Sequence, residues 1–218
     1  GADALSSSCY GPEEAFLALH GHMYLALFVA LGTVLTIFII TTSYSQIVEL
    51  FPTGGGGYLV ASKLLSPKFG VLSGCALYID YILTIAVSIA SGMSAIFSFL
   101  PAGWHPFKLL AAVVCILILI LLNLRGVKES VVPLAPIFLL FIITHVFAIM
   151  YALATHLTGL PVLVENTASE AHQISSEIGF VGMFLLVMRA YSMGAGTYTG
   201  IEAVSNGIPI LREPRVEN

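Results

Sequence analysis

The sequence predicts an all-α integral membrane protein. Hydrophobic residues make up 58% of the 218 residues and charged residues only 9%, whereas a soluble domain carries about a quarter charged residues. The mean hydropathy is +0.98. Five apolar stretches come close to the roughly 20 residues that a membrane-spanning helix needs: 23–44, 71–99, 107–124, 131–155 and 178–211. We therefore expect a multi-pass protein of the cell membrane, with the lipid bilayer as its main partner.

The first apolar stretch, Tyr10 to Leu19, is only about half as long as a membrane span. The chain also begins with Gly1 instead of Met. We expect residues 1–218 to be a single transmembrane domain fragment that runs from the second half of helix 1 through helix 6. That gives about five and a half membrane helices.

Basic residues in the loops predict the orientation, because Lys and Arg accumulate in short cytoplasmic loops. Six of them follow the second, fourth and sixth spans: Lys63, Lys68, Arg125, Lys128, Arg212 and Arg215. The alternate loops contain only Lys108, and residues 158–179 are acidic. Even-numbered spans are therefore expected to end in the cytoplasm. The net charge of −4 and the lack of a basic run argue against a nucleic-acid partner.

The sixth span contains the stretch GAGTYTGIEAVSNG, in which Gly194, Gly196 and Gly200 precede Glu202. Backbone groups in hydrocarbon must be hydrogen-bonded, so a helix break is tolerated only beside protein or a wet cavity. Close helix packing by small residues is the alternative. Packing alone does not require a carboxylate, and an intramembrane carboxylate is a functional candidate. We expect a broken sixth helix with Glu202 just beyond the break.

Two further polar sites interrupt the apolar pattern. Asp3 lies in a serine-rich segment where a helix could resume after a break. Asp80, Thr84 and Ser88 recur every four residues, which places them on one helix face. A lone Asp80 could instead bond a neighbouring helix. Interrupted first and sixth helices are typical of inverted-repeat transporters, whose sites lie between the two breaks.

Five blocks carry a family resemblance: DALSSSCYGPEEAF, ELFPTGGGGY, YIDYILT, LNLRGVKES and TGIEAVSNGIP. With these blocks in order, the chain resembles the first half of a transporter of the amino acid/polyamine/organocation superfamily, most closely its KimA-type potassium importers. The resemblance implies a LeuT-like inverted-repeat fold. It also implies potassium uptake by proton symport, with no enzyme activity and no cofactor beyond the transported potassium ion and proton.

Residue by residue, the resemblance implies potassium contacts from five positions: Asp3, Tyr10, Asp80, Thr84 and Thr199. It makes Glu202 the proton-binding carboxylate. The implied partners are the remaining half of the transporter and, as one possible assembly, a second copy in a homodimer. Carboxylate, hydroxyl and carbonyl oxygens are suitable replacements for the water shell of potassium.

Two other functions remain open from the sequence. A proton-coupled amino acid permease of the same superfamily is one, although Asp3 at the first break would repel the carboxylate of an amino acid. A non-transporting membrane receptor, or a half-protein that folds only with a partner, is the other.

Overall fold

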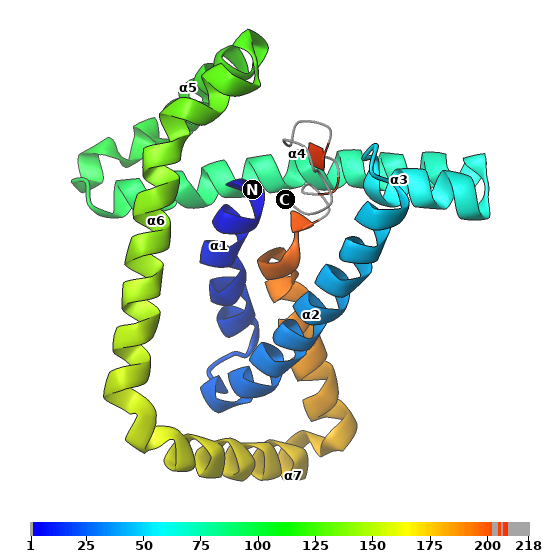
Figure 1. Cartoon of the computed structure of the whole chain (residues 1–218). Helices are drawn as coiled ribbons and strands as arrows, with labels where there is room; N and C mark the ends of the chain where they lie inside the picture. Colours follow the sequence, from blue (N-terminus) through cyan, green and yellow to red (C-terminus); the bar gives the residue numbers. More distant parts are fainter. Residues whose placement is uncertain (1, 202–204, 206, 209–218) are drawn as a thin grey trace. The chain divides into compact units, whose positions relative to one another are not determined.

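The structure is a computed structural model that describes residues 2–201, 205 and 207–208, and every regular element among them is helical (Figure 1). The prediction of an all-α chain is confirmed for these residues. The elements are α1 (Ala2–Ala18), η1 (Met23–Leu25), α2 (Ala26–Leu50), α3 (Gly56–Val60), η2 (Ala61–Leu65), α4 (Pro67–Ser98), η3 (Ala102–Phe107), α5 (Lys108–Arg125), α6 (Val127–His156), η4 (Leu157–Gly159), α7 (Leu160–Met193) and η5 (Gly194–Tyr198).

Four helical runs in the described part of the chain are long and apolar enough to cross a membrane: Met23–Leu50, Pro67–Ser98, Ala102–Arg125 and Leu134–Tyr198. The first three contain the predicted spans 23–44, 107–124 and most of 71–99. The fourth run has 65 residues, far more than the roughly 20 that one crossing requires. It joins most of the predicted fifth span to the part of the sixth span that precedes Thr199.

Gly179 divides α7 into two helical pieces. Its φ of 77° and ψ of 159° are not helical, and glycine adopts a positive φ without the steric cost that a side chain would add. The polar segment before Gly179, which the sequence analysis treated as a loop, is helical. Its Thr167 and Ile174 are buried and lie seven residues apart, so one face of this helix packs against protein.

The described structure forms two compact units, residues 1–85 with 167–218 (unit 1) and residues 86–166 (unit 2). The boundaries fall inside α4 and α7. That residues 1–218 form a single transmembrane domain stays a prediction.

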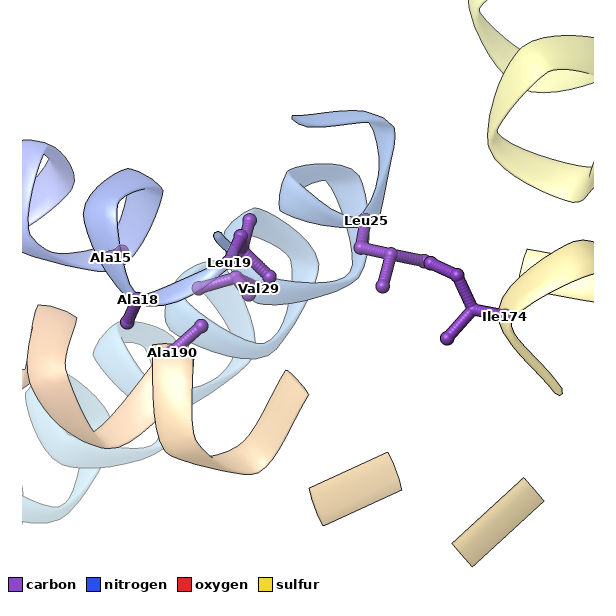
Figure 2. Packing of buried hydrophobic residues seen from close by; sticks show 7 residues of the cluster. All are labelled: Ala15, Ala18, Leu19, Leu25, Val29, Ile174 and Ala190. Carbon is purple, nitrogen blue, oxygen red and sulfur yellow. The ribbon is translucent and has the colours of Figure 1, made fainter. Parts of the chain in front are cut away.

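Unit 1 has a core of alanines and branched aliphatic side chains (Figure 2). Its buried residues are Ala15, Ala18, Leu19, Leu25, Val29, Ile174 and Ala190. They come from α1, the α1–α2 connection, α2 and both pieces of α7. Figure 2 shows Leu25 beside Ile174. This contact packs the polar piece of α7, residues 160–178, against the α1–α2 connection.

Candidate functional site

The predicted interruption of the last membrane helix is present. The α-helix ends at Met193 and is followed by the 3-10 turn η5. Thr199 is extended, with φ −72° and ψ 157°, and Gly200 has φ 87°. Ile201 is helical again. The break therefore falls within the glycine-rich stretch, and the extended residue is one of the predicted potassium contacts.

Helix α1 packs closely against η5, and glycines make this approach possible (Figure 1, where α1 is blue and η5 is orange). A Cβ at Gly11 would lie 2.7 Å from the backbone nitrogen of Thr197. A Cβ at Gly194 would lie 2.9 Å from Cβ of Ala15. Real Cβ atoms do not approach so closely, so both positions require glycine. Close packing and helix interruption, offered by the sequence as alternatives, are both present.

Two predicted potassium contacts meet through a third residue at this junction. The Ser7 hydroxyl lies 3.1 Å from the Tyr10 hydroxyl and 3.2 Å from Oγ1 of Thr199. Thr199 in turn donates to the carbonyl oxygen of Gly196 at 2.9 Å. Ser7 is fully buried. The geometry thus joins the predicted contacts Tyr10 and Thr199 in one hydroxyl network.

The sequence reasoning missed Ser7. The available signal was the spacing of Ser7, Gly11 and Ala15 at four-residue intervals, which places three small residues on one face of α1. All three are buried in the structure.

Asp80 and Thr199 line the same open pocket, which has a volume of about 500 Å³. The pocket is formed by α2, α3, α4 and the residues around η5. Its lining residues are Ile40, Tyr44, Gly57, Tyr58, Ser73, Ala76, Leu77, Asp80, Tyr198 and Thr199. The arrangement offers a carboxylate and several hydroxyl oxygens to one space beside the helix break.

The other predicted site residues are less closely joined to this pocket. Thr84 is half-buried and lies one turn after Asp80 on α4, beyond the residues that line the pocket. Asp3 lies in the first turn of α1. Glu202 falls outside the described residues.

A separate polar contact fixes the polar piece of α7 to the α1–α2 connection. Glu170 accepts a hydrogen bond from the backbone N–H of Tyr24 at 2.9 Å. Its other carboxylate oxygen lies 3.4 Å from Nδ1 of His22. Thr167 donates to the carbonyl oxygen of Tyr24 at 3.3 Å. These contacts explain why this acidic segment is ordered as a helix.

Comparisons with known proteins agree with the resemblance seen in the sequence. The family described as "Amino acid permease" matches residues 4–209. Potassium transporter KimA of Bacillus subtilis (strain 168) is 35% identical over 222 aligned residues, which cover 100% of this chain and 35% of that protein. The chain thus spans about a third of the length of this relative.

These matches confirm the resemblance proposed from the motifs, and together with the apolar helices they indicate a membrane protein. The chain belongs to the amino acid permease family of the amino acid/polyamine/organocation superfamily.

Proposed function

We propose that the protein carrying this chain is a secondary transporter of the cell membrane that imports potassium coupled to protons. The observation that carries the proposal is the pocket at the helix break, where Asp80 and Thr199 line one space of about 500 Å³. A potassium ion must exchange its hydration shell for oxygen ligands. A carboxylate, hydroxyl groups and the backbone of an interrupted helix can supply them.

The proposed potassium ligands are Asp3, Tyr10, Asp80, Thr84 and Thr199. Tyr10 and Thr199 are supported by their shared partner Ser7, and Asp80 by its place in the pocket. The proposal includes a LeuT-like inverted-repeat fold completed by the remaining half of the transporter. A homodimer is a further proposed assembly.

The match to a protein described as a potassium transporter supports the choice of potassium. Energetics make coupled uptake feasible, because one charge moving through 100 mV gains about 2.3 kcal/mol. Two cations that enter together gain roughly 4.6 kcal/mol, which corresponds to more than three decades of concentration ratio.

Amino acid transport is the second candidate, and the description of the matching family favours it. The carboxylate of an amino acid substrate would require exposed N–H groups, as helix N-termini provide in such transporters. In this chain an acidic residue, Asp80, lines the pocket instead. We therefore expect the pocket to bind a cation more readily than an amino acid.

Uptake of radioactive rubidium by the full-length protein that carries this chain separates these functions. In a host without its own potassium uptake, we expect rubidium uptake that unlabelled potassium suppresses and amino acids do not. Suppression by an amino acid, with labelled amino acid entering the same cells, would favour the permease. A host without the protein provides the background rate.

Glu202 is the proposed proton carrier, and Glu202→Gln tests this role. The neutral variant is expected to retain rubidium binding in the purified full-length protein but to lose uptake that depends on a pH gradient. Glu165→Gln, at an exposed position on α7, is the matched control and should behave as wild type. Full-rate uptake with unchanged pH dependence in Glu202→Gln would place the proton elsewhere, and His145 on α6 would be tested next.

A further inference from the structure

The contacts of Glu170 with the α1–α2 connection, here called the Glu170 clasp, join two segments that both lead to the candidate site. On one side of the connection, α1 carries Tyr10. On the other side, the polar piece of α7 continues through Gly179 into the last piece of that helix, which leads to η5 and Thr199. The clasp therefore ties together the segments that bring Tyr10 and Thr199 into one hydroxyl network.

The clasp supplies an acceptor that the start of the helical run Met23–Leu50 needs. The first backbone N–H groups of a helix have no partner within the helix. His22, which precedes the first helical residue, makes no capping hydrogen bond with its side chain. Glu170 accepts from the N–H of Tyr24 instead, at 2.9 Å, and the helix dipole favours a carboxylate at this end. Glu170 thus caps the run from a distant part of the chain.

The second oxygen of Glu170 faces a histidine, whose charge depends on pH. Oε1 of Glu170 lies 3.4 Å from Nδ1 of His22, and their side chains are 19% and 39% exposed. Histidine ordinarily gains a proton as the pH falls from about 8 to about 5. A protonated His22 adds a charge attraction to this contact, whereas a neutral one offers at most a hydrogen bond. The clasp is therefore stronger in mild acid, as long as Glu170 keeps its negative charge.

Other charged groups on the segments that pack here are exposed. They are Glu13 and Glu14 on α1, His20 in the connection, Glu165, His172 and Glu177 on the polar piece of α7, and Arg189 on its last piece. Among the residues that the structure describes, Glu170 is the acidic group within ion-pair distance of His22. The pH response of the clasp is therefore assigned to these two side chains.

Two glycines flank the clasp along the chain, Gly21 before His22 and Gly179 after the polar piece of α7. Both have a positive φ, of 98° and 77°. A Cβ added at either glycine would meet no described atom within 4 Å. Close packing does not fix the chain at these two points. The clasp and the contact between Leu25 and Ile174 (Figure 2) therefore hold the connection against α7.

We propose that Glu170 and His22 form a pH-sensitive clasp that regulates the affinity of the candidate cation site. Protonation of His22 tightens the clasp, which holds α1 and the last piece of α7 together and so keeps Tyr10 and Thr199 joined. In the predicted orientation the clasp faces the outside, where the protons that drive uptake enter. Potassium is then bound more tightly when external protons are available. This inference rests on the proposed function, since it names a regulation of that site.

Hydrogen exchange of the Tyr24 amide measures the clasp without transport. In the purified full-length protein, protection of this amide, corrected for the intrinsic exchange rate, should be about two- to fivefold higher at about pH 6 than at about pH 8, the size of one exposed ion pair. His22→Gln keeps a donor without a charge and should abolish this difference. His172→Gln, exposed on the same piece of α7, is the matched control and should keep it.

Rubidium uptake by the full-length protein measures the consequence for the site. At an external pH of about 6, the KM of His22→Gln should exceed that of wild type by about two- to fivefold. At about pH 8 the two values should agree, because neither protein then carries a charge at this position. His172→Gln should match wild type at both pH values. A purely structural role of His22 would raise KM equally at both.

Each part of the inference has its own contrary result. Wild-type protein without rubidium uptake would overturn the proposed function and the regulation of the site, whereas the exchange of Tyr24 tests the clasp in either case. Equal protection of Tyr24 at both pH values would overturn the clasp itself. Equal KM values for wild type and His22→Gln at about pH 6 would overturn the regulation alone. If His22→Gln did not reach the membrane, a wild-type KM of Glu170→Gln at about pH 6 would overturn it as well.

Discussion

Hydroxyl groups at the helix contacts of unit 1 have different partners from the hydroxyl groups on α6 in unit 2. In unit 1, Ser7 bonds Thr199, which is 192 residues away in the sequence, and Thr36 bonds Tyr191, which is 155 residues away. In unit 2, Thr144 bonds the carbonyl oxygen of Leu140, and Thr155 bonds that of Tyr151, both four residues earlier in the same helix. The hydroxyl groups of Ser7 and Thr36 therefore join helices, whereas those of Thr144 and Thr155 bond within α6.

The difference depends on the size of the neighbouring side chains. Gly11, Gly194 and Gly196 bring η5 close to α1, so hydroxyl groups on the two segments come within reach of one another. The described side chains of α5 and α6 are mainly large and apolar, and most of them are exposed. An exposed apolar surface of this kind is suited to contact with lipid or with another part of the protein. Where no other helix offers a polar neighbour, a hydroxyl group on such a surface bonds a carbonyl oxygen of its own helix.

The largest effect on stability is expected where the helices are closest. Gly11→Ala would place a Cβ 2.7 Å from the backbone nitrogen of Thr197, which cannot move aside as a flexible side chain could. We expect a loss of about 1–3 kcal/mol of stability, measured as a lower Tm of the purified full-length protein in detergent.

Gly92→Ala is the matched control in unit 2. A Cβ at Gly92 would meet nothing within 4 Å, and alanine is a better helix former than glycine by about 1 kcal/mol. The control should therefore have an unchanged or higher Tm. Equal Tm values for the two variants would mean that α1 and η5 do not pack as closely as described.

A smaller effect is expected from Ser7→Ala. This change removes the hydroxyl that joins Tyr10 and Thr199, so the positions of Tyr10 and of Thr199, which lines the pocket, are less well fixed. We expect KM for rubidium to rise by about three- to tenfold, the range for one lost hydrogen bond. Ser43→Ala on α2 removes a hydroxyl that bonds the carbonyl oxygen of Ile39, four residues earlier in its own helix, and should leave KM unchanged. The comparison would fail if both variants changed KM equally.

The smallest effect is expected from Thr144→Val, which removes a hydroxyl without a change of shape. It donates to the carbonyl oxygens of Leu140 and Phe141 in its own helix, and surface changes of this kind usually alter stability by less than about 0.5 kcal/mol. The Tm and rubidium uptake should match wild type, in contrast to Ser7→Ala in unit 1. A KM change as large as that of Ser7→Ala would remove the distinction between the two regions.

Much of the fold could be predicted because membrane helices are read from apolar length alone. The spans 23–44, 71–99 and 107–124 follow from this rule, and the break at residues 194–200 follows from its glycines. The helical state of residues 160–178 could not be read in this way, because a polar segment outside the apolar spans has no such constraint. Its helix is fixed by tertiary contacts, such as those of Glu170 with His22 and Tyr24.

The candidate site was predictable only in part. Asp80 and Thr199 stood out as polar residues in apolar surroundings, and the structure brings both to one pocket. Thr84 shares a helix face with Asp80, but one turn displaces it by about 5.4 Å along the axis, beyond the residues that line this pocket. The spacing of Ser7 with Gly11 and Ala15 marks one face of α1, but it does not reveal the partner of Ser7, because Thr199 lies 192 residues away in the sequence.

Asp80→Asn tests most directly whether the pocket beside the helix break binds the transported cation. The variant keeps the shape of the side chain but removes its charge, and rubidium uptake by the full-length protein is measured against external rubidium, with Glu165→Gln as the control. We predict a KM at least about tenfold higher than wild type, with a normal amount of protein in the membrane. A wild-type KM in Asp80→Asn would contradict the account and leave Asp80 as a contact between helices only.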